Sequence, residues 1–253
     1  MPQLGGSEIT TEHAEKEEKV RIAWGVTGAG HYLKESFDLF LGLKNDCGDR
    51  VSITSFVSRA AEEVIRVYGL FRLLEVISTG AYMQEVILES EQGWSYPKTG
   101  RFSRGNYNAL FVSPATSNTV AKIVYGIADS LITNAVAHGV KGGVSVFVVP
   151  VDIEGSVQSA VPYFIDRELC VECEKCRQAC PNEAIEEQIN YLKCQGCGLC
   201  KDACDYGAIQ RGHVNLVIRD IDRQNVQKLR RLERITVLDN PTQLREALWA
   251  IVR

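Results

Sequence analysis

The sequence predicts an α/β fold with a parallel sheet covered by helices, together with a small α+β module rich in cysteine. Two observations carry this prediction. Short apolar runs typical of buried strands alternate with segments whose apolar residues recur at helical spacing. Eight of the nine cysteines lie in two copies of one spacing pattern. With 253 residues, 45% of them hydrophobic, the chain has room for one large domain and one small module.

Order is expected to begin at a buried strand, Val20 to Gly25, that runs into a glycine turn at Val26–Gly30. A helix follows from His31 to Leu41, with apolar residues at 33, 37, 40 and 41. Such a turn presents backbone amides and a helix N-terminus to an anion, typically a phosphate. Residues 1–18 are glutamate-rich without a core-forming pattern, and a disordered leader is expected there.

A dinucleotide site of the Rossmann type is not favoured at this turn. Leu33 stands where the third glycine of G-x-G-x-x-G is required. The next strand, Val51 to Val57, ends in Ser58-Arg59 and not in an acidic residue for a ribose. His31 is interpreted as a solvent-facing residue at a helix start.

The alternation continues along the chain. A helix is expected from Arg59 to Leu74, and a mixed segment from Thr79 to Gly105. A strand over Tyr107–Ser113 then leads into the turn Pro114-Ala-Thr-Ser-Asn-Thr119 and one helix over Val120–Thr133. A buried strand follows at 143–149, and an amphipathic helix at 242–252 closes the sheet. In such a sheet, ligands bind at the carboxyl ends of the strands.

The two cysteine runs each have the spacing C-x2-C-x2-C-x3-C, which is typical of a pair of four-iron clusters. In this arrangement three thiolates of a run hold one cluster, and the fourth reaches across to the other. One expected set is therefore Cys170, Cys173, Cys176 and Cys204, and the second is Cys194, Cys197, Cys200 and Cys180.

Eight cysteines could instead form disulfides or bind zinc. Disulfides require an oxidising compartment, and no secretory signal pattern begins the chain. Zinc sites usually take cysteines in pairs, whereas these runs exceed what a tetrahedral site needs. Pro181 follows Cys180 but Asp205 follows Cys204, a departure that leaves ligation intact.

Charge and hydropathy restrict the partners and the location. The net charge of -4 gives no reason to expect nucleic acid. No apolar run is long enough for a membrane span, so a soluble, cytoplasmic protein is expected. Residues 163–212 hold nine acidic and six basic side chains, a net of -3, which suits a cationic redox partner or is simply a solvated acidic surface.

The turn Pro114–Thr119, with Ala121-Lys122 and Gly126-Ile-Ala-Asp129, resembles the signature of the homo-oligomeric flavin-containing cysteine decarboxylase family. The chain is most similar to its archaeal flavoprotein and dihydromethanopterin reductase (acceptor) branch, through residues 23–30, 107–134, 218–226 and 235–241. The resemblance implies a Rossmann-like flavoprotein that binds FMN. The expected cofactor-binding residues are Thr27, Gly28, Ala29, Gly30, Ser58, Ser113, Pro114, Ala115, Thr116, Ser117, Asn118 and Thr119.

The resemblance also implies the domain organisation, because the chain is family-like on both sides of the cysteines. The expected FMN domain is discontinuous, 19–162 and 214–253, with a 2[4Fe-4S] ferredoxin-type domain inserted at 163–213. Two departures from the family argue against decarboxylation. Arg101 occupies the matching place of the catalytic histidine, and Pro150-Val151-Asp152-Ile153 stands where the P-x-M-N clamp is found. Cys47 and His138 are interpreted as structural.

The function implied is an FMN-dependent oxidoreductase. Electrons from a ferredoxin-type donor would pass through the clusters to FMN and reduce a pterin, most simply dihydromethanopterin to tetrahydromethanopterin. No side chain is singled out as catalytic. A non-catalytic electron-transfer flavoprotein is the main alternative, and a cysteine decarboxylase the lesser one. Family relatives form trimers and larger closed shells, so Trp94 and Tyr96 are candidates for stacking at a neighbour's site or for ordinary packing.

Overall fold

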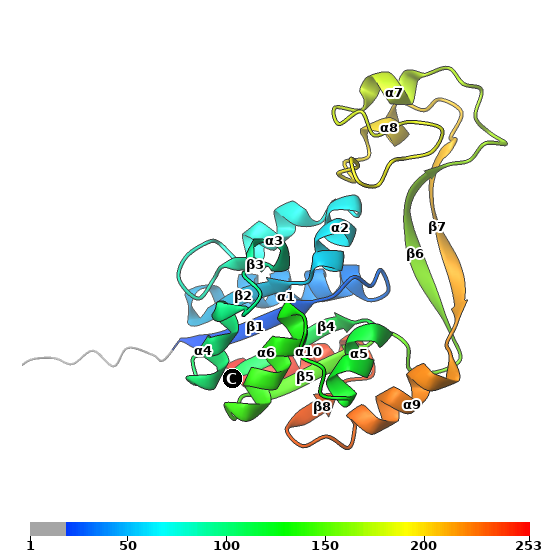
Figure 1. Cartoon of the computed structure of the whole chain (residues 1–253). Coiled ribbons are helices and arrows are strands. Elements are labelled where there is room, and N and C mark those ends of the chain that lie inside the picture. The colour runs from blue at the N-terminus through cyan, green and yellow to red at the C-terminus, as the bar shows by residue number, and fades with distance from the viewer. Residues whose placement is uncertain (1–18) are drawn as a thin grey trace, which may run out of the picture.

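Six parallel strands form the sheet at the centre of the structure, a computed structural model that describes residues 19–253 (Figure 1). The leader expected at 1–18 lies outside the described residues. All five neighbouring pairs are parallel, so the predicted parallel sheet is confirmed. In spatial order the strands are β3 (Val86–Leu88), β2 (Val51–Val57), β1 (Val20–Val26), β4 (Ala109–Ala115), β5 (Ser145–Pro150) and β8 (Ile235–Val237).

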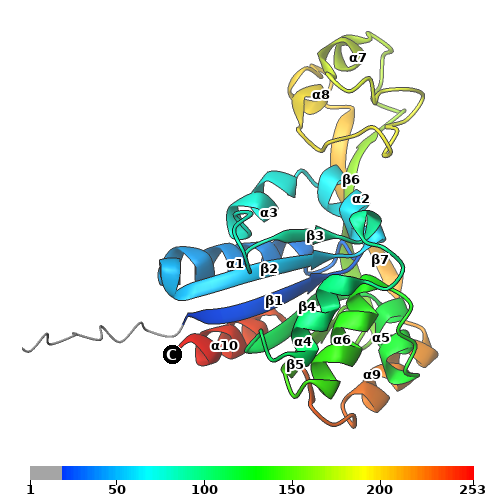
Figure 2. The same ribbon diagram turned by 60° about the vertical axis from the view of Figure 1, so that its left-hand side comes forward.

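Helices cover both faces of the sheet, each over its own apolar core (Figures 1 and 2). Side chains alternate between the two faces along a strand, so in β1 Ile22 and Trp24 join one core and Ala23 the other. The first core is covered by α1 (Leu33–Cys47), α2 (Arg59–Val67), α3 (Phe71–Ile77) and α10 (Pro241–Val252). The second is covered by α4 (Gly100–Ser103), α5 (Ser117–Val124), α6 (Leu131–Lys141) and α9 (Asp220–Leu229). Single 3₁₀ turns occur at η1 (Gly48–Arg50), η2 (Glu89–Glu91) and η3 (Pro97–Thr99).

Two segments predicted as single helices are each broken at a glycine. The helix expected over 59–74 ends at Val67 and resumes at Phe71, because Gly69 adopts a left-handed φ of 75°. The helix expected over 120–133 is likewise divided into α5 and α6 near Gly126, whose φ is 70°. Both predictions were wrong about continuity because the apolar spacing resumes after each break on the same face of the sheet.

The cysteine runs lie in a small module carried on a two-stranded antiparallel ribbon (Figure 1). The ribbon strands are β6 (Ser156–Ile165) and β7 (Ile209–Val217), and between them lie the short helices α7 (Lys175–Ala179) and α8 (Leu199–Asp202). The module has a small apolar cluster, with five further cysteines of the two runs packed against it. Its buried members are Ile165, Ile185, Ile189, Cys200 and Ile209. A core this small contributes little stability without metal or disulfide cross-links.

None of the helices within residues 19–253 has both the length and the apolar character needed to cross a membrane.

Candidate functional site

The residues expected to bind the flavin lie at the carboxyl ends of three neighbouring strands. The turn after β1 is central, with the end of β2 on one side and the end of β4 on the other. The order β3-β2-β1-β4-β5 reverses direction between β1 and β4, and ligands of open α/β sheets bind outside the carboxyl ends at such a switch point. All twelve predicted residues therefore gather at one edge of the sheet.

Thr27 links two of these strand ends. Its hydroxyl donates to the carbonyl oxygen of Pro114 at 2.7 Å and accepts from the amide N–H of Thr116 at 2.9 Å. Its own N–H also donates to the Pro114 carbonyl at 3.3 Å. Thr27 is 2% exposed, so this polar network is held inside the protein and fixes the glycine turn against the β4 turn.

The helices α2 and α5 both begin at this edge. Ser58 caps α2, with its hydroxyl accepting from the amide of Ala61, and Thr116 caps α5 by accepting from the amide of Thr119. A helix N-terminus offers free amides and a partial positive charge, which suits a phosphate or a polarised flavin oxygen. Ser117 is half-buried and Asn118 exposed on the first turn of α5, so their polar groups remain accessible.

Gly28 lies close to the start of α2. A Cβ placed on it would be 2.7 Å from the Cβ of Ala60 and 3.1 Å from the Ala60 carbonyl carbon. The glycine therefore allows the turn and the helix N-terminus to approach each other, which a larger residue would prevent.

A hollow of about 450 Å³ opens beside the same edge. It is lined by residues from several parts of the chain: after β1, after β5, at the base of the ribbon, at the end of α9 and after β8. These are His31, Tyr32, Val151, Ile153, Glu154, Ser156, Val157, Gln158, Arg230 and Asp239. The His31 ring lies 3.8 Å from the Tyr32 ring, centroid to centroid. The hollow is within the size range of small-molecule sites.

Asp152, which follows β5 at this edge, was not among the predicted site residues. Burial raises the pKa of its carboxyl above the ordinary value, an effect that hydrogen bonding from Ser117 opposes and the charge of Asp222 reinforces. The signal that could have identified it is its place directly after a buried parallel strand adjacent to β4. Sequence reasoning treated the position only as a departure from a clamp.

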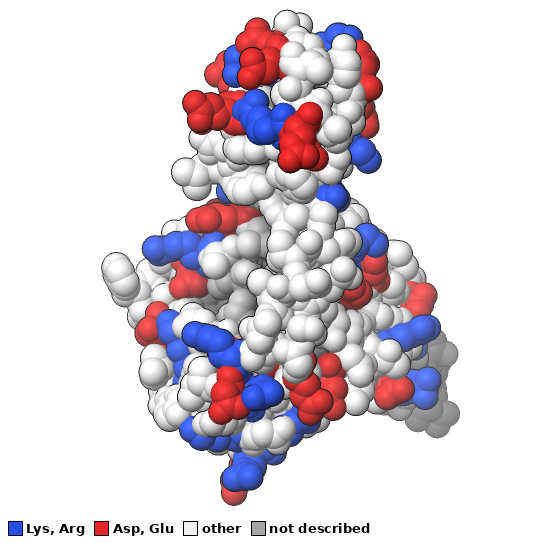
Figure 3. Space-filling view, turned by 90° about the vertical axis from the view of Figure 1, so that its right-hand side faces the viewer, with Lys and Arg blue, Asp and Glu red and all other residues white. Residues whose placement is uncertain are grey.

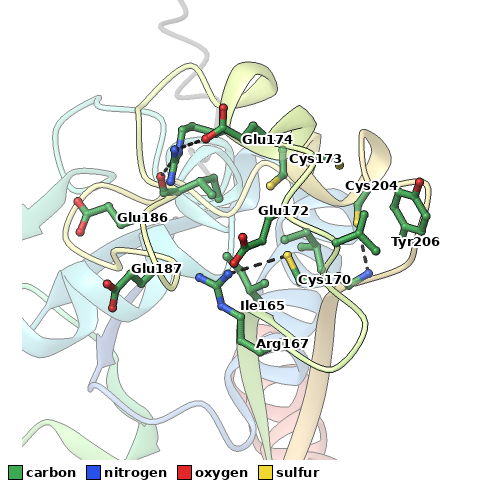
Figure 4. A pocket seen from close by; sticks show the side chains of 16 residues that line it. Ile165, Arg167, Cys170, Glu172, Cys173, Glu174, Glu186, Glu187, Cys204 and Tyr206 are labelled. Atoms are coloured by element: carbon green, nitrogen blue, oxygen red, sulfur yellow. Dashed lines mark hydrogen bonds and ion pairs between the residues drawn. The ribbon is translucent and has the colours of Figure 1, made fainter.

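The eight cysteines divide into the two expected groups of four. One cavity, of about 300 Å³, is lined by Cys170, Cys173, Cys176 and Cys204. A second, much tighter at about 10 Å³, is lined by Cys180, Cys194, Cys197 and Cys200. Figure 4 shows the thiols of Cys170, Cys173 and Cys204 around the first cavity. The fourth cysteine of each run thus lies with the first three cysteines of the other run.

Each group of four thiols lines a cavity of its own. Among residues 19–253, no three His, Cys, Asp or Glu side chains meet closely enough to hold one metal ion. A tetrahedral zinc site would need sulfurs at about 2.3 Å from a common centre. A polynuclear cluster instead needs four thiolates around its corners, and the donor set and its arrangement fit that group.

Backbone amides donate to the sulfurs in a repeated manner. The N–H of Ala184 donates to Cys180 Sγ and that of Ala208 to Cys204 Sγ, both at 3.3 Å. Amide hydrogen bonds to the sulfurs are one of the means by which a protein adjusts a cluster's potential. Burial raises the pKa of the Cys200 thiol to about 11, so a metal is the group that would hold this sulfur as a thiolate.

Acidic side chains surround the first cavity. Glu172, Glu174, Glu186 and Glu187 line it together with Arg167 and Arg177 (Figure 4). Arg177 pairs with Glu174 at 2.7 Å, and Lys175 pairs with Asp205 nearby. Figure 3 shows acidic groups and fewer basic ones over the module at the top of the view. The surface around this cavity is therefore predominantly negative.

Other residues singled out from the sequence have partners outside the group of twelve. Arg101 forms a paired ion bridge with Glu85, just before β3 begins, with Arg101 Nη2 and Glu85 Oε1 2.8 Å apart. His138 Nδ1 hydrogen-bonds Ser103 Oγ at 2.8 Å, and Cys47 ends α1. Tyr96 is buried in the core, whereas Trp94 is 96% exposed, so only Trp94 is free to contact another molecule.

Comparison with known proteins gives consistent matches along the chain. Residues 10–154 match the family model described as flavoprotein, and residues 163–186 and 187–210 each match a 4Fe-4S binding domain. A Methanosarcina mazei protein named dihydromethanopterin reductase (acceptor) is 56% identical over 234 residues, which cover 89% of this chain and 98% of that one. A Methanocaldococcus jannaschii protein of the same name is 48% identical over 234 residues, covering 90% and 95%.

The fold is similar to that of a solved relative. The crystal structure of DmrB from Burkholderia xenovorans in complex with FMN, described as a cubic protein cage for redox transfer, is 28% identical, with a TM-score of 0.59. The match covers 92% of this chain and 94% of that chain.

Proposed function

The chain belongs to the flavoprotein family, and on that premise we propose that it is an iron-sulfur flavoprotein oxidoreductase that reduces dihydromethanopterin to tetrahydromethanopterin. Family membership confirms the resemblance drawn from the sequence. The observation that carries the proposal is 56% identity to a dihydromethanopterin reductase (acceptor) over nearly the full length of both chains. The two 4Fe-4S binding domains supply the electron-transfer part of the same chain.

Two [4Fe-4S] clusters would be held by the two groups of cysteines. Cys170, Cys173, Cys176 and Cys204 line one cavity, and Cys194, Cys197, Cys200 and Cys180 line the other, which supports ligation across the two runs. The module's apolar core is small, so clusters bound in this way would also stabilise its fold.

FMN would bind at the carboxyl edge of the sheet. Thr27, Gly28, Ala29 and Gly30 would present the turn after β1, and Ser58 the start of α2. The β4 turn would contribute Ser113, Pro114, Ala115, Thr116, Ser117, Asn118 and Thr119. The Thr27 network supports this assignment because it fixes the two turns relative to each other before any ligand binds.

FMN when bound would collect electrons one at a time and deliver a pair. The chain's own residues would position the electron donor and the acceptor relative to each other. Conversion of the dihydro to the tetrahydro pterin consumes two electrons and two protons, so two single-electron deliveries are needed for each turnover. The hollow lined by His31 and Tyr32 lies at the same edge and has room for an acceptor.

The electron donor would be a ferredoxin-type protein, and the assembly a homo-oligomer. A relative described as a cubic cage supports a closed assembly of trimers or more, in which the exposed Trp94 could reach a neighbouring chain. The eight cysteines of the module are free of disulfides, as is usual in a reducing compartment. We therefore propose that the protein is cytoplasmic.

The test is single-turnover and steady-state reduction of dihydromethanopterin by the purified protein with its clusters and FMN. We expect reduced ferredoxin to bleach the flavin absorbance. We also expect two electrons to be consumed for each pterin that is converted to the tetrahydro form. Rapid ferredoxin oxidation with no pterin turnover would favour the alternative, a non-catalytic electron carrier. Absence of flavin from the purified protein would exclude both.

A further inference from the structure

A close backbone contact joins the cysteine module to the flavin-binding domain, and it lies in the second cysteine run. Gly69, in the turn between α2 and α3, lies against Gly196, in the loop between Cys194 and Cys197. A Cβ on Gly69 would be 2.7 Å from the carbonyl oxygen of Gly196, and a Cβ on Gly196 would be 2.4 Å from the amide nitrogen of Gly69. The two backbones therefore touch, and no side chain fits between them.

The contact extends on one side to a cysteine sulfur. The amide N–H of Gly196 donates to Cys194 Sγ at 3.4 Å. The residue that touches the flavin domain is thus directly hydrogen-bonded to a thiol of the second group.

On the other side the contact extends to the glycine turn after β1. Tyr68 is covalently joined to Gly69, and its hydroxyl donates to the carbonyl oxygen of Ala160 in β6 at 2.5 Å. A Cβ on Gly30 would be 2.6 Å from the Tyr68 hydroxyl, so this tyrosine lies against the turn proposed to hold FMN. A cavity of about 280 Å³ opens here, lined by Gly30 and Tyr68 on one side and by Tyr191 and Leu192 of the module on the other.

The first cysteine run does not make the equivalent contact, although its backbone has the same shape. Glu172 and Glu174 occupy the positions of Gly196 and Gly198 in the repeat, and all four have positive φ angles, between 55° and 84°. A left-handed backbone favours glycine, yet the first run carries glutamates there, and both are exposed. Glycine is thus present in the run that faces the flavin domain, and the run that faces solvent keeps acidic side chains.

We propose that the two clusters act in a fixed order, with the cluster of Cys180, Cys194, Cys197 and Cys200 as the inner one that delivers electrons to the flavin. The cluster of Cys170, Cys173, Cys176 and Cys204 is then the outer one, which receives electrons through its acidic surface. This inference rests on the proposed function. Gly69, Gly196 and Tyr68 are positioning residues that keep the inner cluster against the flavin-binding turn.

The electrons balance over two passages. In each passage a one-electron donor of the ferredoxin type would reduce the outer cluster. That electron would then pass to the inner cluster and from it to the flavin. Two passages and two protons from solvent complete one reduction of the flavin.

The order is tested by electron paramagnetic resonance on the full-length protein with FMN and clusters in place. Reduced clusters speed the spin relaxation of the flavin signal in partly reduced protein, and the effect falls steeply with distance. Cys173→Ser and Cys197→Ser are a matched pair, since both cysteines are exposed and stand at equivalent places in the two runs. We expect Cys197→Ser to lower the power at half-saturation of the flavin signal several-fold, and Cys173→Ser to leave it close to the wild-type value.

The reverse pattern, or equal effects of the two substitutions, overturns the proposed order. Iron and flavin contents are measured on the same samples, because a wild-type protein without FMN or without eight irons would contradict the proposed function itself.

A second pair of variants keeps the test valid if a cysteine variant loses both clusters. Gly196→Ala places a Cβ against Gly69, whereas Gly207→Ala has no atom within 4 Å of the new Cβ. Both glycines have similar positive φ angles, 61° and 65°, so the backbone strain is matched. We expect Gly196→Ala alone to slow the relaxation of the flavin signal with both clusters retained. Unchanged relaxation in Gly196→Ala overturns the role of the contact.

Discussion

Thr27 and Thr116 join the carboxyl ends of β1 and β4, with the amide N–H of Thr116 donating to Thr27 Oγ1 at 2.9 Å. Replacement of Thr27 by Val keeps the shape of the side chain but removes its hydroxyl. The Thr116 amide and the Pro114 carbonyl then each lose one hydrogen-bond partner. The loss of such a buried partner costs about 1–3 kcal/mol. If the cost falls on the flavin-bound state, FMN affinity drops roughly tenfold to a hundredfold.

This prediction is checked by titrating FMN into the flavin-free protein and following flavin fluorescence. Thr27→Ser retains the hydroxyl and is the control, with affinity expected near that of the wild type. Equal affinities for the Val and Ser variants would show that the Thr27 hydroxyl does not organise the flavin site.

Gly28→Ala is expected to disturb the same site by crowding. Its new Cβ would lie 2.7 Å from the Cβ of Ala60, at the start of α2. Overpacking of this kind costs about 1–3 kcal/mol, and here it also displaces the helix N-terminus capped by Ser58. We expect a lower thermal midpoint and less FMN bound after gel filtration. Gly93→Ala, which meets no atom within 4 Å, should change neither quantity.

Each cluster would take its fourth cysteine from the other run, and this predicts which cysteine variants lose the same cluster signal. Cys180→Ser should remove the same cluster signal as Cys194→Ser, and Cys204→Ser the same signal as Cys170→Ser. In each variant the iron content should fall from about eight to about four per chain. Iron analysis and electron paramagnetic resonance of the reduced protein check this.

Cys47→Ser is the control for this series, because Cys47 ends α1 outside the module and should leave the iron content unchanged. A signal lost in common by Cys180→Ser and Cys170→Ser would contradict ligation across the two runs.

The Glu85 carboxylate should make acid stability depend on pH. Hydrogen bonding from Arg101, with a further contribution from Lys98, lowers its pKa from 4.5 to about 2. A depressed carboxyl pKa contributes stability that is fully present above pH 4.5 and is lost as pH falls from 4.5 towards 2. The Glu85 side chain is 22% exposed, so after allowance for solvent screening we expect Glu85→Gln to cost about 2 kcal/mol at pH 7.

Tryptophan fluorescence during urea unfolding measures this effect, because all three tryptophans, Trp24, Trp94 and Trp249, lie outside the cysteine module. The difference between wild type and Glu85→Gln should shrink below pH 4.5. Asp38→Asn is the control, since the Lys34–Asp38 pair is well exposed and such a pair is worth only about 0.3–0.5 kcal/mol. A difference that stays constant down to acid pH would rule out the ion pair as its source.

Local patterns in the sequence predicted much of this protein. The cysteine spacing is a short-range signal because the ligands of a cluster are set by a few intervening residues. The alternation of apolar runs likewise predicted the parallel sheet, and with it the gathering of Thr27 and Thr116 at one edge.

Tertiary contacts account for what the sequence did not predict. Gly69 and Gly196 are far apart in the chain, so nothing near Gly69 reveals the partner that it must accommodate. The apolar residues before and after Gly69 pack into the same core, so their spacing gives no sign of the break between α2 and α3. Asp152 was not predicted because the groups that act on its pKa come from other elements: Asp222 adds to the rise caused by burial, and hydrogen bonding from Ser117 opposes it.

The ribbon strands β6 and β7 determine where the cysteine module could be removed from the chain. Ser156 pairs with Val217, so the chain leaves the host domain and returns to it at neighbouring points. Closing so short a gap by a tight turn costs little chain entropy. We therefore expect that a flavin domain cut at the base of the ribbon and rejoined by a turn will still fold, and that another small electron carrier can be inserted at the same place.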